Sequence, residues 1–319
     1  MLLRRFVACT CSVGILIFGT GGVFAQKYPN KPIRIVTAPA GSANDIASRL
    51  IGQGLMENLG QRVIVDNRPG FLGIEVAAKA SSDGYTLLLF GGGVWLSQFF
   101  NSQVAWDPER DFAPLTLVIT SPNVIAVHPS VPVKSVEELI ALAKAKPGHL
   151  NYASGPQGVG PHLAAELFKY MTGTDIVRVS YKGTGPSVAA LIAGEVQVMF
   201  VAAGSVMGYV KSGRLRALAV ASSRQSELAP GIPSLETSVP GYESAVMIGM
   251  WAPARTNAAI IKFLHREIVR VLNRPDIKER FFEMGTEVVA SSPEEYAAAI
   301  RNDTAKWKKV IAAAGIRPE

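Results

Sequence analysis

One stretch near the N-terminus constrains the fold more than any other part of this sequence. An apolar run at residues 33–36 is typical of a buried strand. A loop of small residues at 37–41 ends that strand, and the helix-capping types Ser42, Asn44 and Asp45 follow it. Apolar residues then recur at helical spacing up to residue 59. The stretch therefore predicts a strand, a tight loop and a helix start.

Such a junction directs free backbone N–H groups and the positive end of the helix dipole at one point. That point suits a carboxylate or a phosphate. The loop contains no Lys or Arg, so dipoles and hydroxyl groups would have to hold an anion there. The alternative is a plain strand-to-helix turn, because open α/β sheets bind ligands at only some of their turns.

The pattern recurs in the middle of the chain. A short apolar strand at 150–152 leads into the loop 153–160, again without a charged residue, and a helix follows. The spacing of Gly155, Gly158 and Gly160 is not the GxGxxG of dinucleotide sites. Two such loops predict a cleft with a helix N-terminus on each wall. The glycines at 91–93 close a third strand, and indicate either close approach of a ligand or a flexible turn.

The rest of the chain alternates strands and helices, which favours α/β layers with mainly parallel sheets. Two apolar runs, 115–119 and 124–127, are separated by Ser121-Pro122 and predict strands that cross into a second domain. A run at 246–251 predicts the returning strand. We therefore expect domain 1 at residues 26–124 and 246–319, and domain 2 at residues 125–245.

The first 25 residues resemble a secretory signal peptide. Arg4 and Arg5 precede an apolar segment, and Val-Phe-Ala ending at Ala25 suits cleavage. A membrane anchor is the alternative, but no basic stop-transfer flank follows. Both cysteines, Cys9 and Cys11, fall inside this segment, so the mature chain would have no disulfide and no thiolate chemistry.

The charges argue against a nucleic-acid-binding protein. The formal net charge is +7, and removing Arg4 and Arg5 leaves +5, spread along the chain rather than clustered. No histidine pair has metal-ligand spacing, and neither a GxSxG elbow nor a P-loop is present. His162 opens the helix after the second loop and is either a polar wall of the cleft or a locally packed residue.

Several motifs resemble those of the periplasmic receptors of tripartite tricarboxylate transporters, the Bug receptors. They are YPNKPIR at 28–34, AGSAND at 40–45, VDNRPG at 65–70, DGYTLL at 83–88, DFAP at 111–114, LNYASG at 150–155, YKG at 181–183 and AGI at 314–316. The family usually has proline and two glycines where this chain has Ala40-Gly41-Ser42. Val201-Ala202 stand where many members have Asp-Asn, so we expect a less polar second wall.

The resemblance implies a two-domain periplasmic-binding-protein-like fold, with a ligand cleft between α/β domains and no enzymatic activity, metal or cofactor. It implies a small carboxylate ligand: a di- or tricarboxylate, an acidic amino acid or an aromatic acid. It also implies that membrane components of a tripartite transporter are partners. We expect a periplasmic monomer that closes around its ligand. The rival hypothesis is a secreted α/β enzyme acting on a small phosphorylated or carboxylated substrate. The predicted ligand-binding residues are Ala40, Gly41, Ser42, Asn44, Asp45, Gly92, Ser154, Gly155, Gln157, Gly158, Gly160 and His162.

Overall fold

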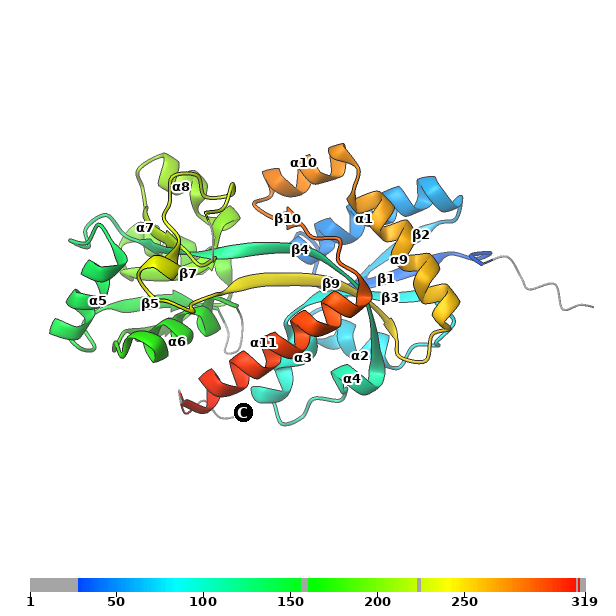
Figure 1. Cartoon of the computed structure of the whole chain (residues 1–319), viewed down its shortest axis with the longest axis horizontal. Helices are drawn as coiled ribbons and strands as arrows, with labels where there is room; N and C mark the ends of the chain where they lie inside the picture. The colour runs from blue at the N-terminus through cyan, green and yellow to red at the C-terminus, as the bar shows by residue number, and fades with distance from the viewer. Residues whose placement is uncertain (1–27, 156–159, 223–224, 314, 316–319) are drawn as a thin grey trace, which may run out of the picture.

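The computed structural model describes residues 28–155, 160–222, 225–313 and 315. It shows two α/β halves joined by two long strands (Figure 1). The strand order is β2-β1-β3-β9-β4-β7-β5-β6, with β8 and β10 also paired to β4. This arrangement confirms the predicted two-domain α/β fold.

The first half contains a parallel group of strands in which β1 lies between β2 and β3. Its elements are β1 (Ile33–Thr37), α1 (Ala43–Leu59), β2 (Val63–Asn67), α2 (Leu72–Ala78), β3 (Thr86–Gly91), α3 (Gly93–Leu96), η1 (Ser97–Phe99) and α4 (Pro108–Asp111). After the second half, the chain returns to form α9 (Ala258–Leu272), α10 (Pro275–Glu283), β10 (Glu287–Val288) and α11 (Pro293–Ala313).

The second half contains its own parallel group, with β5 between β6 and β7. Its elements are α5 (Val136–Ala145), β5 (Asn151–Ser154), α6 (Gly160–Thr172), β6 (Val177–Ser180), α7 (Thr184–Ala193), β7 (Val198–Ala202), η2 (Ala203–Ser205), α8 (Met207–Lys211), β8 (Arg216–Val220) and η3 (Leu235–Thr237). Two long strands join the parallel groups of the two halves. Strand β9 (Ala245–Pro253) pairs antiparallel with β3, and strand β4 (Phe112–Val127) pairs antiparallel with β7.

The crossing strands are β4 (Phe112–Val127) and β9 (Ala245–Pro253). The prediction of two strands interrupted at Ser121-Pro122 was wrong, since β4 is continuous over 16 residues. Its pairing with β9 ends at Pro122, and its pairing with β7 begins at the next residue, Asn123. The proline therefore falls where the strand changes partners, so its missing N–H interrupts neither ladder.

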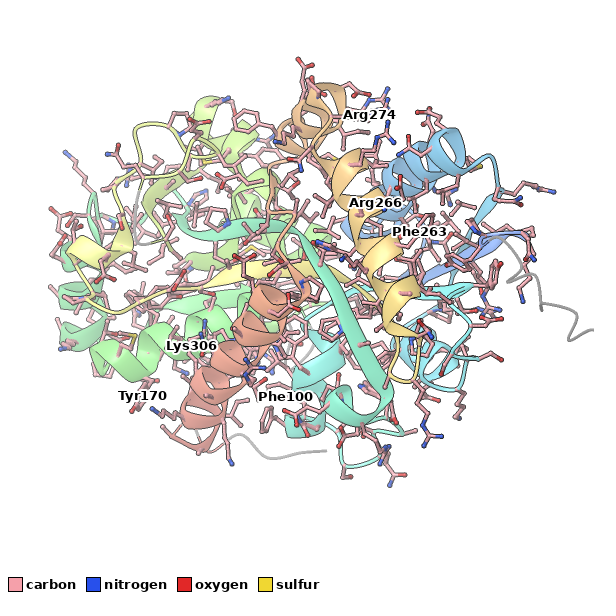
Figure 2. All side chains as sticks on the ribbon, turned by 45° about the vertical axis from the view of Figure 1, so that its right-hand side comes forward. Phe100, Tyr170, Phe263, Arg266, Arg274 and Lys306 are labelled. Carbon is pink, nitrogen blue, oxygen red and sulfur yellow. The ribbon has the colours of Figure 1, made fainter. Side chains whose placement is uncertain are left out.

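Helices cover both faces of the first sheet. One apolar cluster joins β1, β3 and β9 to α1, α9 and α10. A second cluster lies on the other face with α2, α3 and α11, and continues into β5 and α6 of the second half. Figure 2 shows the outer surface of α9, where the guanidinium of Arg266 lies 5.2 Å from the ring centre of Phe263.

The terminal helix α11 begins with a capping box. The hydroxyl of Ser292 accepts a hydrogen bond from the Glu295 amide at 3.1 Å, and the Glu295 carboxylate accepts one from the Ser292 amide at 2.8 Å. The helix then packs against β4, α3 and α6. It therefore spans the junction between the halves, as Figure 1 shows.

Candidate functional site

A cavity of about 380 Å³ lies where β3 ends, between the two halves. Asn44 in the first turn of α1 lines it from the first half, with the glycines 91–93 at the end of β3. Gly160 and Thr184, the first residues of α6 and α7, line it from the second half. Three helices of at least 10 residues thus begin on one cavity. This is the position at which open α/β sheets bind ligands.

A smaller cavity of about 180 Å³ also takes residues from both halves. It shares Val246 of β9 with the larger cavity, and Ala43, the first residue of α1, lines it. Larger hollows of about 660 and 730 Å³ exist, but each is lined by residues of one half only. We therefore place the candidate site in the two cavities at the junction.

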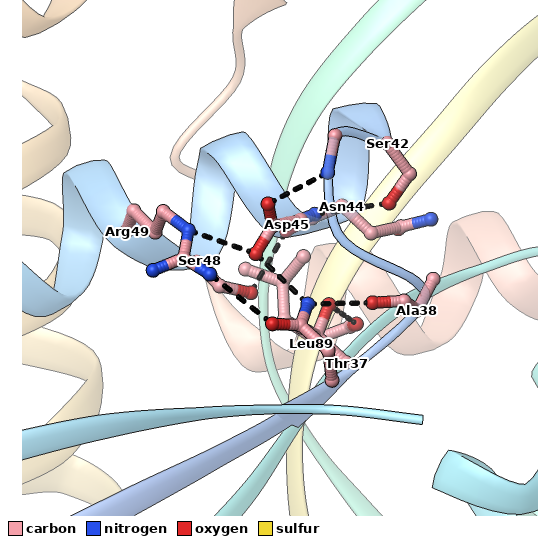
Figure 3. A network of polar contacts seen from close by, with 10 residues as sticks. Thr37, Ala38, Ser42, Asn44, Asp45, Ser48, Arg49 and Leu89 are labelled. Atoms are coloured by element: carbon pink, nitrogen blue, oxygen red, sulfur yellow. Dashed lines mark hydrogen bonds and ion pairs between the residues drawn. The ribbon is translucent and has the colours of Figure 1, made fainter. Parts of the chain in front are cut away.

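The first loop is held by Asp45, which points back into it (Figure 3). Its buried carboxylate accepts hydrogen bonds from the Gly41 amide at 2.9 Å and from the Asn67 side chain at 2.8 Å, and forms an ion pair with Arg49 at 3.0 Å. The Ser42 hydroxyl caps α1 by accepting a hydrogen bond from the Asp45 amide at 3.2 Å. Asp45 therefore braces its own loop.

Two opposing effects act on the pKa of Asp45. Burial alone would raise it, but the hydrogen bonds from Gly41, Asn67 and Arg49 and the charge of Arg49 outweigh burial. The pKa is therefore held below the ordinary value of 3.8. Asp45 is ionised at neutral pH, with its charge directed at the loop and at Arg49.

The brace leaves helix amides free. In the described part of the chain, the backbone N–H groups of Ala43 and Asn44 donate to no protein acceptor. Figure 3 shows the Asn44 side chain pointing away from Asp45, and its buried Oδ1 has no hydrogen-bond partner among the described residues. The end of α1 thus presents two backbone amides and the side-chain amide of Asn44, whose Nδ2 is a further donor.

The second wall is braced by a cation that the loop sequence does not contain. Arg178 on β6 donates from Nε to the Ser154 hydroxyl at 2.9 Å and from Nη2 to the Gly155 carbonyl at 2.9 Å. Ser154 is fully buried. Arg178 was missed because it lies 24 residues from Ser154 along the chain and reaches it only through the pairing of β5 with β6.

His162 is buried in α6, with 4% of its surface exposed, and does not line either cavity. Burial lowers its pKa from 6.5 to about 4, and the positive charge of Arg178 acts in the same direction. The side chain is therefore neutral at pH 7. Its surroundings agree with the packed alternative rather than with a polar wall of the cleft.

The other predicted site residues are distributed as follows. Asn44, Gly92 and Gly160 line the larger cavity. The remaining described ones lie in or beside the two loops and line neither cavity: Ala40, Gly41, Ser42, Asp45, Ser154 and Gly155. Gln157 and Gly158 lie outside the described residues. Of the glycines at 91–93, Gly93 has the least room for a side chain, because a Cβ atom there would lie 2.8 Å from the Phe71 ring.

Sequence reasoning missed the aromatic and acidic lining of the larger cavity. Phe71, Trp95, Asp303 and Trp307 all contribute to it. The i,i+4 spacing of Asp303 and Trp307 on α11 was the available signal, but it did not show that α11 packs against α3. Within the described residues, no cluster of His, Cys, Asp or Glu could hold a metal ion.

Comparison with known proteins identifies the family. A family model described as the tripartite tricarboxylate transporter family receptor matches residues 47–316. The chain belongs to this receptor family. Protein BugT of Bordetella pertussis is 32% identical to this receptor over 315 residues, which cover 96% of this chain and 97% of BugT.

Solved structures agree with this assignment. The structure of R. palustris Rpa4515 with adipate matches this receptor with a TM-score of 0.81 and 31% identity, covering 92% of this chain and 100% of that one. MatC from Rhodopseudomonas palustris with bound malate matches with a TM-score of 0.75 and 25% identity, covering 89% and 100%. The family resemblance is therefore confirmed, and the chain is a periplasmic solute-binding receptor rather than a member of an enzyme family.

No helix within the described residues has both the length and the apolar character needed to cross a bilayer. The predicted signal peptide lies in residues 1–27, outside the described part.

Proposed function

We propose that this receptor binds a small carboxylate in the junction cavities and delivers it to the membrane components of a tripartite transporter. The observation that carries the proposal is the convergence of the starts of α1, α6 and α7 on one cavity. Each helix start adds a partial positive charge of about half a unit. No Lys, Arg or His is among the described residues that line either cavity, so helix amides, with uncharged side chains such as Asn44 and Thr184, are the available donors.

The neighbours support the choice of a carboxylate over a phosphate. Adipate and malate, named with Rpa4515 and MatC, are both carboxylates. For this chain we propose direct contacts from the amides of Ala43 and Asn44 and from the loops around Gly92, Gly155 and Gly160. Asp45 and Arg178 position those loops from behind.

We further propose that binding closes the two domains about β4 and β9. Domain 1 comprises residues 26–124 and 246–319, and domain 2 comprises residues 125–245. Two continuous strands and the packing of α11 connect the halves beside the larger cavity, an arrangement that suits hinged closure. A smaller radius of gyration by small-angle scattering at saturating ligand is expected. An unchanged radius together with conversion of the ligand would favour the enzyme hypothesis.

A backbone experiment tests the proposed anion contact. Ala43 occupies the first position of α1, where proline fits the helix, and Ser42 has an extended conformation (ψ 160°) compatible with a following proline. Ala43→Pro removes one free amide and leaves every other side chain of the site unchanged. Loss of a charge-assisted hydrogen bond of about 1.5–3 kcal/mol should weaken carboxylate binding roughly 10- to 100-fold by titration calorimetry.

Ala258→Pro is the matched control. Ala258 is also an exposed first residue of a helix after an extended cap (ψ 135°), but it lies on α9 away from both cavities. It should leave affinity unchanged. Equal affinities for Ala43→Pro and the parent chain would overturn the proposed contact, and equal binding of a carboxylate and its neutral amide would overturn carboxylate recognition itself.

Export is proposed with cleavage after Ala25, giving a monomeric mature receptor. N-terminal sequencing of the exported protein should begin at Gln26 or within two residues of it, and light scattering should give the mass of one chain. An intact Met1 on a membrane-embedded chain would contradict the export proposal.

A further inference from the structure

We propose that the ligand is a carboxylate with one negative end and an apolar, ring-sized body, rather than a di- or tricarboxylate. This inference rests on the proposed function and narrows it to a substrate class. Its first support is the lining of the larger cavity. Beyond the helix starts that lining is mostly apolar and includes Phe71, Phe90, Trp95, Leu163, Met247 and Trp307.

The aromatic side chains form a surface that a ligand would cover. Phe71 lies at the cavity with 41% of its surface exposed, and its ring centre is 6.4 Å from that of Phe90 and 6.0 Å from that of Trp106. Gly93 lets the Phe71 ring approach the backbone, since a Cβ atom there would clash with it. An exposed aromatic side chain that lines a cavity gains from contact with an apolar ligand body.

Asp303 supplies the second support, because it is the one charged residue among the described residues lining either cavity. The indole of Trp95 donates to its Oδ2 at 2.9 Å and the indole of Trp307 donates to its Oδ1 at 2.8 Å. Only about 10% of its side chain is exposed. The structure therefore holds a carboxylate rigidly in the cavity wall.

Lys306 partly offsets this charge, with its Nζ 3.1 Å from Asp303 Oδ1. It also donates to the Glu243 carbonyl at 3.2 Å and does not line either cavity. Figure 2 shows it at the edge of α11 nearest the second half. The ligand thus meets the carboxylate of this pair rather than the ammonium group.

A second carboxylate on the ligand would be poorly accommodated at this wall. It would lose water against aromatic side chains, approach Asp303, and find no Lys, Arg or His among the described lining residues. A hydroxyl or amide N–H would instead find an acceptor, since each carboxylate oxygen has more than one lone pair. The far end of the ligand is therefore apolar or a hydrogen-bond donor.

Ligand pairs that share a body but differ in charge test this inference in the parent protein. Hexanoate should bind at least 10-fold more tightly than adipate, and benzoate at least 10-fold more tightly than terephthalate. The measurement is titration calorimetry, with quenching of tryptophan fluorescence as a second readout because Trp95 and Trp307 line the cavity. In addition, 4-hydroxybenzoate should bind at least as tightly as benzoate.

The outcomes separate this inference from the proposed function. Adipate or terephthalate binding as tightly as its monocarboxylate partner would overturn the substrate class and leave carboxylate binding intact. Failure of all these carboxylates to bind would overturn the proposed function as well.

Two variants sharpen the result. Asp303→Asn should improve adipate affinity at least 5-fold with little change for hexanoate, whereas Asp276→Asn, an exposed aspartate on α10, should change neither. Phe71→Ala should weaken benzoate binding at least 5-fold. Leu72→Ala should not, although Leu72 is equally exposed at 44%, because it does not line the cavity. Equal effects of Phe71→Ala and Leu72→Ala would contradict the aromatic contact.

Discussion

The two cleft loops each follow a parallel strand, but they are braced by opposite charges. In each, a residue on the adjacent parallel strand reaches the loop: Asn67 of β2 on the first wall and Arg178 of β6 on the second. The first wall adds the acid Asp45, which binds the Gly41 amide and so removes a donor from the loop. The second wall uses a base, which binds the Gly155 carbonyl and so removes an acceptor.

This contrast shows that a charge near an anion site need not face the anion. Asp45 would repel a carboxylate if it pointed into the cleft, but its hydrogen bonds to the loop, to Asn67 and to Arg49 occupy it. Arg178 likewise acts on the loop from behind. Under the proposed function, the negative end of the ligand meets peptide dipoles at the helix starts rather than either of these charged side chains.

The largest expected effect comes from removing the acidic brace. Asp45→Ala should lower the free energy of unfolding by about 3 kcal/mol, because it breaks a buried set of charge-assisted hydrogen bonds. Urea denaturation measures this loss. Arg49→Ala is the milder control, since Arg49 is exposed and the Gly41 and Asn67 bonds would remain.

Acid titration provides a second test of the same brace. The folded-state pKa of Asp45 is lowered, so its contribution is fully present above the unfolded value near 3.8 and is lost as the pH falls through the folded value. The difference in stability between the parent and Asp45→Asn should therefore shrink below about pH 4. A difference that stays constant down to pH 2 would contradict the assigned role.

The second wall should respond at a higher pH because of His162. Its folded-state pKa is lowered to about 4, so between pH 6.5 and 4 the unfolded chain binds a proton that the folded chain does not. Stability should fall by roughly 2–3 kcal/mol over this range. His162→Gln should remove most of that slope, while Arg178 and Lys169, which oppose the imidazolium, and Glu166, which favours it, remain in place.

Removing the basic brace should reduce affinity more than stability. Arg178→Met removes the donor shared by the Ser154 hydroxyl and the Gly155 carbonyl, which keep the 3.2 Å hydrogen bond between them. It should weaken ligand binding about 10-fold while lowering stability by about 1–2 kcal/mol. The exposed Lys182→Met, which makes the same change of charge nearby, serves as control. Equal affinities for the two variants would mean that Arg178 does not position the loop.

The smallest effect is expected for Ser154→Ala. The Ser154 hydroxyl accepts the hydrogen bond from Arg178, and its loss should lower stability by about 1 kcal/mol. Affinity should change less than 3-fold if the hydroxyl acts only through its hydrogen bonds with Arg178 and the Gly155 carbonyl. A 10-fold loss of affinity with unchanged stability would show instead that Ser154 donates to the ligand directly.

Much of the first wall could be predicted from the sequence because its contacts are local. Ser42 caps α1 three residues ahead of its donor, and Asp45 accepts from Gly41 four residues before it. The hydrogen bond between Trp95 and Asp303, in contrast, joins residues 208 positions apart. No periodicity reports such a pair, so the acidic and aromatic part of the cavity was missed.

The sequence by itself determined the α/β pattern, the two small-residue loops and the helix caps, because each depends on residues within a few positions of one another. Only the tertiary structure decided what stands behind and opposite those loops. Strand pairing brings Arg178 to Ser154, and the packing of α11 against α3 brings Asp303 between Trp95 and Trp307. Those contacts depend on how whole elements pack, which the local order of residues does not specify.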